Sequence, residues 1–314
     1  MSTKRKRMSI KRKRVSRGIG ANVGIIRAYT KAIKAISTDF RAFVVNEILN
    51  FLENKHALTA DSLRPLTSEE RKKNRVLKQK LLNEFAKRNP DLLKSDLDKF
   101  ISNNMALWSE LLATASVNRV TKYINQMAFM TSEAQRRAFL SAKVTKGLVN
   151  KAFTVPTVKN RFISENALKA LPDLIRDNVN LITKLNIEDV NRISETIYNG
   201  LMNGENFNQL RDVLKATQGF TDRRADTVAQ DQTNKITQLI QIENAKALGV
   251  KKAVWIHVAG KYTSRASHVR MNGQEFDITK GCWDDYEKKH IFPAELINCR
   301  CEMQMIFDDE VLNG

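Results

Sequence analysis

Most of the chain has the apolar spacing of amphipathic helices. Between residues 22 and 248, apolar side chains recur at steps of three and four residues, so that they share one helix face. Polar breaks and residues such as Pro65, Pro90 and Gly200 divide this pattern into segments. The predicted helices span residues 22–55, 67–87, 92–112, 132–146, 164–178, 186–199, 207–216 and 221–248.

Three of these boundaries depend on capping signals, the first at Thr67 and Glu70, which have the spacing of a capping box. Ser132 and Gln135 have the spacing of a capping box, and Asn186 precedes acidic residues that suit the first turn of a helix. Residues 147–160 interrupt the helical pattern and are the best candidate for a linker. We therefore expect new helices to begin at Ser132 and at Asn186.

The pattern changes after Gly249. Residues 253–258 form a short β-rich run, and residues 301–307 alternate apolar and polar side chains as a strand does. We therefore expect a mainly α protein, in which an elongated, basic, helical N-terminal half and a helical lead-in precede a small C-terminal α+β module. The expected divisions are a disordered basic tail at 1–18, a basic all-helical region at 19–158, a helical region at 159–248 and the α+β module at 249–314.

Charge is distributed very unevenly along the 314 residues. The formal net charge is +19, but residues 1–158 carry +20 and residues 159–314 carry −1. No apolar run approaches the roughly 18 to 20 residues needed to cross a bilayer, so no integral membrane segment is expected. Arg27, Lys31 and Lys34 interrupt the stretch that would follow a signal-peptide start, which argues against secretion.

The basic residues are candidates for contact with a polyanion. Residues 1–17 contain nine lysines or arginines and no acid, and each residue that neutralises a phosphate releases a counterion. Few aromatic residues interleave, which favours duplex phosphate or an acidic protein over single-stranded RNA. A solvated tail, a nuclear-localisation signal or a membrane-surface patch has similar composition. The candidate DNA-binding residues are Lys4, Arg5, Lys6, Arg7, Lys11, Arg12, Lys13, Arg14, Arg17, Arg71, Lys72 and Lys73.

Cysteine and histidine gather near the C-terminus. All three cysteines and three of the four histidines lie between residues 257 and 301, and in a chain without a secretory signal this favours reduced thiols or metal. A structural zinc ion, the one cofactor that the sequence suggests, takes about four N or S ligands. A single residue separates Cys299 from Cys301, so either both project from one face or a turn at Asn298 reorients them. The alternative is three buried structural cysteines beside a hydrogen-bonded histidine. The candidate ligands are His268, Cys282, Cys299 and Cys301.

Five elements of this region occur in a characteristic order. They are a tryptophan strand, an Arg-x-x-His segment, a glycine turn, the Phe292-Pro293 stretch and a terminal Asn-Cys-Arg-Cys. With the helices upstream, residues 186–307 resemble the Mu F-like minor head proteins of tailed bacteriophages. Cys282 is not one of the matched positions, which weakens its assignment as a ligand. The matched positions are Trp255, Arg265, His268, Gly273, Asn298, Cys299, Arg300 and Cys301.

The resemblance implies a nonenzymatic minor capsid protein that takes part in head morphogenesis. Such a protein is incorporated with the portal, lies inside the capsid, binds the genome and aids assembly, packaging or genome delivery. The implied partners are the portal protein and double-stranded DNA, with scaffold or major capsid protein as further partners. The implied location is the virion, inside the capsid near the portal, and the host cytoplasm during assembly.

Two other functions compete with this one. His268 as general base, with Arg265 and Asn272 near a phosphate, would suit a nuclease-like or nucleotidyl-transfer enzyme. Neither paired acids at a metal spacing nor a glycine-rich phosphate loop accompanies these residues. Alternatively, the basic half contacts a membrane surface or RNA during host entry.

Overall fold

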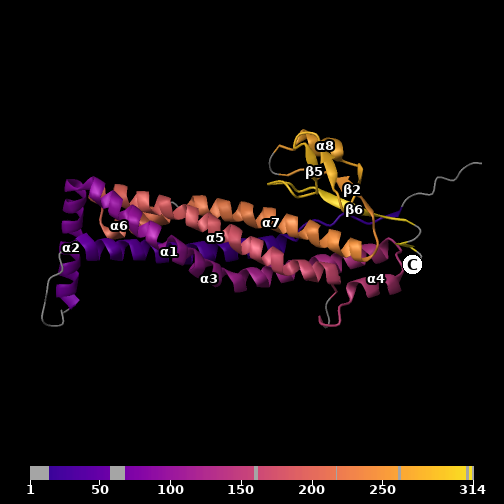
Figure 1. Cartoon of the computed structure of the whole chain (residues 1–314), viewed down its shortest axis with the longest axis horizontal. Coiled ribbons are helices and arrows are strands. Elements are labelled where there is room, and N and C mark those ends of the chain that lie inside the picture. Colours follow the sequence, from indigo (N-terminus) through magenta and orange to yellow (C-terminus); the bar gives the residue numbers. More distant parts are fainter. Residues whose placement is uncertain are drawn as a thin grey trace, which may run out of the picture. The chain divides into compact units, whose positions relative to one another are not determined.

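The computed structural model describes residues 14–56, 68–158, 162–216, 218–260, 263–308 and 311–312. Helices make up most of these residues, and short antiparallel strands gather toward the C-terminus, which confirms a mainly α fold (Figure 1). The helices are α1 (Val23–His56), α2 (Ser68–Arg88), α3 (Pro90–Ser141), α4 (Lys146–Phe153), α5 (Glu165–Met202), α6 (Phe207–Ala216), α7 (Gln218–Ala247) and α8 (Ala266–Met271). The strands are β1 (Arg14–Val15), β2 (Lys252–Ile256), β3 (Glu275–Asp277), β4 (Cys282–Asp284), β5 (Lys289–Ile291) and β6 (Glu302–Phe307).

The chain forms two compact units, and each combines segments that are distant in the sequence. Unit 1 comprises Met1–Arg27, Lys122–Leu174 and Ala229–Gly314, and unit 2 comprises Ala28–Thr121 and Ile175–Val228. The divisions expected at residues 158 and 248 therefore do not coincide with the borders of these units. Over the described ranges, no helix combines the length and the apolar content that crossing a bilayer requires.

Unit 2 is helical and has an aromatic core. The rings of Phe51 in α1 and Phe100 in α3 stack with centroids 4.2 Å apart, and Phe100 meets the buried Trp108 edge to face at 5.8 Å. Tyr29 is fully buried, and its hydroxyl donates to Asn178 Oδ1 of α5 at 3.1 Å. The apolar stripes seen in the sequence thus pack against one another, as amphipathic helices require.

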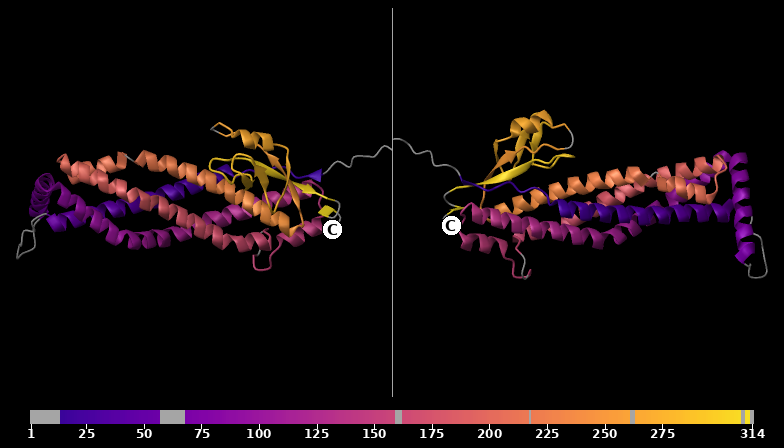
Figure 2. Two further views of the ribbon diagram at one scale, coloured as in Figure 1. Left: turned by 45° about the horizontal axis from the view of Figure 1, so that its top comes forward. Right: turned by 180° about the vertical axis from the view of Figure 1, so that it is seen from behind.

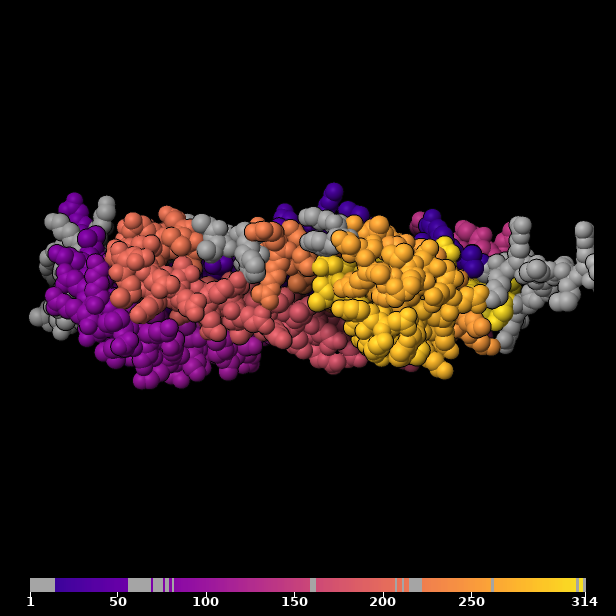
Figure 3. Space-filling model, turned by 90° about the horizontal axis from the view of Figure 1, so that it is seen from above, coloured from indigo at the N-terminus to yellow at the C-terminus, as the bar shows by residue number. Residues whose placement is uncertain are grey.

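Unit 1 contains a four-stranded sheet in the order β1-β6-β2-β3, in which the paired strands are antiparallel. The alternation seen in residues 301–307 is confirmed, because Met303, Met305 and Phe307 are buried. Phe139 of α3 contacts Phe153 and Phe307 edge to face, with centroids 5.9 and 5.1 Å apart. These contacts join the sheet to α3 and α4. In Figure 3 the C-terminal residues, coloured gold to yellow, form one continuous surface.

The N-terminal segment is part of this sheet. β1 pairs with the end of β6, so that the indigo and yellow strands lie side by side (Figure 2). The backbone N–H of Ser16 donates to Met305 O at 3.0 Å, and the Ser16 hydroxyl accepts from Met305 N at 3.0 Å. The prediction of disorder over residues 1–18 is therefore wrong for residues 14–16, because their backbone pairs with β6. Residues 1–13 lie outside the described residues.

A buried polar network crosses unit 1. Asn244 of α7 is fully buried, and its Nδ2 donates to Ser132 Oγ at 2.9 Å and to Gln135 Oε1 at 3.0 Å. Its Oδ1 accepts from the backbone N–H of Ser164 at 3.1 Å. One asparagine therefore joins α7 to α3 and to the residue before α5, and its buried polar atoms are satisfied.

The same helix holds the segment that follows β1. The Nε2 atoms of Gln238 and Gln241 both donate to the carbonyl of Ile19, at 3.2 and 3.0 Å. Gln135 Nε2 in turn donates to the carbonyl of Gln241 at 2.8 Å. Glutamines on α7 thus fix the chain just after the basic N-terminus.

Three predicted boundaries are wrong. Ser132 lies inside α3, and its hydroxyl accepts from α7 rather than capping a helix. Asn186 lies inside α5, where its Nδ2 donates to the carbonyl of Ile182 at 2.8 Å. The expected linker at 147–160 instead contains most of α4, because Phe153 is fully buried in the unit 1 core.

Candidate functional site

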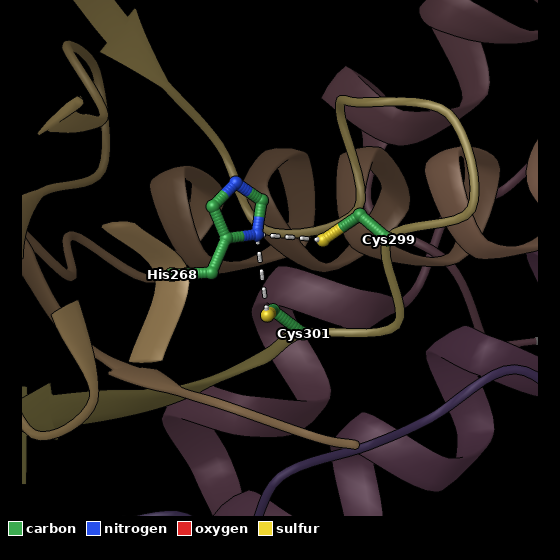
Figure 4. A group of neighbouring side chains, drawn as sticks. All are labelled: His268, Cys299 and Cys301. Carbon is green, nitrogen blue, oxygen red and sulfur yellow. Dashed lines mark hydrogen bonds between the residues drawn. The ribbon is translucent and has the colours of Figure 1, made fainter. Parts of the chain in front are cut away.

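Three of the four predicted metal ligands lie together. His268 comes from α8, and Cys299 and Cys301 come from the segment before β6 (Figure 4). His268 Nδ1 lies 3.4 Å from Cys299 Sγ and 3.7 Å from Cys301 Sγ. All three side chains are buried, and their donor atoms lie within 4.8 Å of one another. One metal ion could contact all three.

A turn directs both thiols to the same place. Asn298 has a φ of 62°, and its backbone N–H donates to Asp231 Oδ1 of α7 at 3.1 Å. The carbonyl of Cys299 accepts from Asn234 Nδ2 at 3.2 Å. Cys299 and Cys301 both precede β6, so the alternation of strand side chains does not apply to them. The structure confirms the turn that the sequence offered as one explanation.

A buried carboxylate lies on the other side of the imidazole. His268 Nε2 is 3.5 Å from Asp284 Oδ2, but it makes no hydrogen bond to any described residue. Asp284 is fully buried and accepts from the N–H groups of Tyr286 at 2.8 Å and Glu287 at 3.3 Å and from the Ser267 hydroxyl at 3.1 Å. Burial raises the pKa of Asp284, but these hydrogen bonds outweigh it and hold the pKa below its usual range. These contacts thus favour the ionised form of Asp284.

The two thiols titrate as a pair. The pKa of Cys299 is lowered to about 4, chiefly because Cys301 hydrogen-bonds to it; burial opposes this, and His268 adds to it. The pKa of Cys301 is raised, first by Cys299 and then by burial. The pair therefore loses its first proton easily and its second reluctantly, as coupled groups do.

Cys282 is not part of the cluster that His268, Cys299 and Cys301 form, so the geometry does not support this member of the predicted ligand set. Its Sγ lies 3.7 Å from Gln274 Oε1, and burial raises the pKa of this thiol. The sequence reasoning missed His257, whose Nδ1 lies 3.6 Å from Cys301 Sγ. The backbone N–H of His257 donates to Asn272 Oδ1 at 2.9 Å, which holds this histidine beside the cluster. The one sequence signal for it was its place among the clustered cysteines and histidines.

A cavity of about 280 Å³ adjoins the cluster. Arg265, Arg300 and His257 line it together with the three clustered residues. Arg265 Nη2 donates to the carbonyl of Ile297 at 3.1 Å, and Asn272 binds the backbone of His257. The structure thus brings Arg265 to the same cavity as His268, while their catalytic role stays a prediction.

The remaining motif residues support the imidazole. Trp255 of β2 is fully buried, and its ring meets the His268 ring edge to face with centroids 5.3 Å apart. Gly273 follows α8 with a φ of 83°, and its N–H donates to the carbonyl of Trp255 at 2.8 Å. Glycine adopts this conformation without the strain that a side chain brings. The matched motif residues therefore belong to one local structure around His268.

The DNA-binding candidates are only partly described. Arg17 is exposed. Arg14 belongs to β1, and Arg71, Lys72 and Lys73 belong to α2. Their contacts with DNA stay predictions. The candidates outside the described residues are Lys4, Arg5, Lys6, Arg7, Lys11, Arg12 and Lys13.

Comparison with known proteins supports the family resemblance. Residues 191–304 match the model of the family "Phage Mu protein F like protein". A protein of Haemophilus influenzae (strain ATCC 51907 / DSM 11121 / KW20 / Rd) named "Uncharacterized protein" is 23% identical over 146 residues. The aligned segment covers 46% of this chain and 31% of that relative. No solved structure matches the chain significantly. The match covers the Arg-x-x-His and Cys-Arg-Cys elements, so residues 191–304 are similar to the Phage Mu protein F like family over the segment that carries the motif.

Proposed function

We propose that the chain is a minor head protein of a tailed phage and that it acts in head morphogenesis. The observation that carries this proposal is the family match over residues 191–304, which contain the whole His268 cluster. Capsid proteins are the partners that this family suggests, and the virion is the location. The portal is the partner that we propose for the neutral C-terminal module, and the interior of the capsid near the portal is the proposed place.

We further propose that the basic N-terminal part binds the packaged genome without reading its sequence. Residues 1–158 carry a net charge of +20, and residues 1–13 alone contain seven lysines or arginines and no acid. Binding through phosphate neutralisation needs no defined fold in those residues. By this contact the chain would aid genome packaging or delivery.

The proposed role is not catalytic. His268 is buried, its Nδ1 faces two thiols, and its Nε2 faces Asp284. Both ring nitrogens thus face buried groups of the protein, which favours a structural role. Incubating the intact protein with duplex DNA and divalent metal tests this point. Cleavage that disappears on Arg265→Gln would favour the nuclease-like alternative.

The salt dependence of DNA binding tests the genome contact. A variant with glutamine at all seven basic positions of residues 1–13 keeps β1 and Ser16 intact, whereas deletion of residues 1–17 would also remove a strand. Each phosphate contact contributes about 0.9 to the slope of log K against log salt, so the slope falls by up to about six. An unchanged slope would dismiss the tail as a DNA contact.

Two controls make this test specific. Seven glutamine substitutions at exposed basic residues of the neutral half, among them Lys184, Lys251 and Lys280, are expected to leave the slope nearly unchanged. RNA and anionic vesicles at matched salt separate the genome from the other two polyanions. Preference for vesicles over duplex DNA would contradict the proposal.

Assembly itself tests the head role. Portal, scaffold and major capsid proteins of the same phage are assembled with and without this chain, and the particles are treated with protease. We expect the chain to enter particles that contain portal and to resist the protease. A chain that stays outside, or that enters particles equally well without portal, would contradict the proposed location.

A further inference from the structure

We propose that His268, Cys299 and Cys301 bind a zinc ion and that His257 supplies the fourth ligand. All four residues belong to unit 1. The inference rests on side-chain geometry and does not depend on the proposed head role.

The distances among the three buried residues fit a tetrahedral ion. With Zn–S of about 2.3 Å and Zn–N of about 2.0–2.1 Å, a nitrogen and a sulfur on one tetrahedron lie about 3.6 Å apart. His268 Nδ1 lies 3.4 and 3.7 Å from the two sulfurs. A hydrogen bond would explain a single contact between a thiol and the ring nitrogen. Two thiols against the same nitrogen instead match two N···S distances of a tetrahedral metal site.

The far side of the imidazole also fits a metal ligand. A metal on Nδ1 leaves the proton on Nε2, which faces the carboxyl group of the buried Asp284 at 3.5 Å. Ligating histidines commonly direct their second ring nitrogen to a carboxylate, which fixes the ring and its tautomer. Nε2 is buried and has no hydrogen-bond partner among the described residues. A bound metal would give this N–H a defined role as donor to Asp284.

His257 is placed to complete the site. Its Nδ1 lies 3.6 Å from Cys301 Sγ, the same edge length, and it lines the same cavity as the three ligands. It does not belong to the group whose donor atoms all lie within 4.8 Å of one another, so the proposal requires its side chain to turn toward the ion on binding. Two thiolates and two imidazoles form a donor set typical of tetrahedral zinc and unlike the oxygen ligands of Mg²⁺ or Ca²⁺.

A cysteine nucleophile is the main competing explanation. Cys299, His268 and Asp284 have the order of a nucleophile, a base and an orienting acid. Cys299 is only 4% exposed, however, and Cys301 lies against the same ring nitrogen, where a nucleophilic site has no use for it. A disulfide between the two cysteines is a second alternative.

The metal would join three separate segments of the C-terminal module. His257 follows β2, His268 lies on α8, and the two cysteines precede β6. Hydrogen bonds already join these segments, among them that of the His257 N–H to Asn272 Oδ1 and that of Arg265 to the carbonyl of Ile297. Zinc would further fix the loop region between the strands.

Metal content and cobalt spectra test the proposal in the full chain. Protein purified under reducing conditions is stripped with a chelator and titrated with Zn²⁺ or Co²⁺. We expect one metal per chain, with the visible absorption of tetrahedral Co²⁺ and a thiolate charge-transfer band. Cys299→Ser and His268→Gln are expected to lose the metal, and Cys282→Ser, the matched control, is expected to keep it.

Substitutions at Asp284 and His257 test the proposed roles of these two residues. Asp284→Asn is expected to weaken zinc affinity by about 10- to 100-fold while keeping the stoichiometry, because it orients His268 without touching the metal. His257→Ala is expected to weaken affinity and to change the cobalt spectrum. An unchanged affinity and spectrum in His257→Ala would overturn its assignment as the fourth ligand.

The parent protein decides the question even if a ligand variant does not fold. Zinc is expected to protect two of the three thiols from alkylation, and chelation is expected to expose them. A zinc content near zero with no tetrahedral cobalt spectrum would overturn the proposal. So would a disulfide between Cys299 and Cys301 in reduced preparations, or one thiol that is alkylated rapidly whether or not metal is present.

Discussion

Replacing Asn244 by alanine tests the buried polar network of unit 1. The side chain is fully buried and makes hydrogen bonds of 2.9 Å to Ser132, 3.0 Å to Gln135 and 3.1 Å to the N–H of Ser164. Alanine removes all three bonds. It also leaves the Ser164 N–H and the Gln135 amide oxygen without this partner inside the protein.

The size of the effect follows from these lost partners. A buried polar group left unsatisfied costs about 1–3 kcal/mol, so two such groups cost about 2–6 kcal/mol. We expect the free energy of opening unit 1 to fall by about 4 kcal/mol, a large part of the roughly 5–15 kcal/mol that stabilises a typical domain.

Hydrogen exchange measures this loss within unit 1. Peptides from the C-terminal part of α7 and from β6 report the opening free energy of that unit separately from unit 2. Lys246→Ala is the control on the same helix, since it removes only a surface ion pair with Glu243 and is expected to change stability by at most about 0.5 kcal/mol. If Asn244→Ala lowers the opening free energy of unit 1 by less than about 1 kcal/mol, the network does not stabilise this unit as argued.

Three further substitutions test other parts of the fold. Phe139→Ala is expected to lower the free energy of unfolding by about 3–5 kcal/mol, because its buried ring contacts two other phenylalanines; urea denaturation measures this, and a loss below about 1 kcal/mol would contradict it. Gly281→Ala is expected to lower the melting temperature, because φ is 88° and a Cβ would lie 2.7 Å from the carbonyl oxygen of Ile291; an unchanged melting temperature would show that the turn relaxes. Burial raises the pKa of Tyr29, so stability is complete below about pH 10, where the unfolded phenol ionises, and falls as pH rises above that value. Tyr29→Phe is expected to flatten this alkaline decline, followed by circular dichroism, and equal declines in both proteins would argue against the buried phenol.

The hydrophobic periodicity predicted the helices well but misplaced some of the boundaries between them. The three- and four-residue steps are local, and the predicted helical stripes lie in helices of the structure, except that the one predicted at 132–146 crosses the break between α3 and α4. Ser132 and Gln135 have capping-box spacing, yet their side chains bind Asn244, which lies more than a hundred residues away. A side chain that hydrogen-bonds to a distant helix has the same sequence pattern as a side chain that caps the helix on which it lies.

The strand β1 could not be predicted from local pattern. It has two residues, one of them Arg14, within a segment whose charge density predicts disorder. Its partner, β6, lies at the other end of the chain. Only pairing across the whole sequence gives it a structure.

Residue type found the cluster but could not choose among its members. His268, Cys299 and Cys301 were predicted because metal-binding residue types gather there, and Cys282 was included for the same reason. Cys282 and Asp284 share the buried face of β4, and it is the acid that approaches His268. The sequence shows which residues of a strand share a face, but it does not show which of them contacts a particular residue elsewhere in the fold.

The pairing of β1 with β6 fixes the point at which residues 1–13 join the fold. Thirteen residues span at most about 45 Å when fully extended, so every phosphate that they can neutralise lies within that radius of Arg14. The strand that follows the Cys-Arg-Cys element therefore also holds the chain where its most basic stretch joins the fold. If the C-terminal module docks in the head, residues 1–13 meet the packaged DNA at a high local concentration. The distance that these residues can span then limits DNA binding more than their intrinsic affinity does.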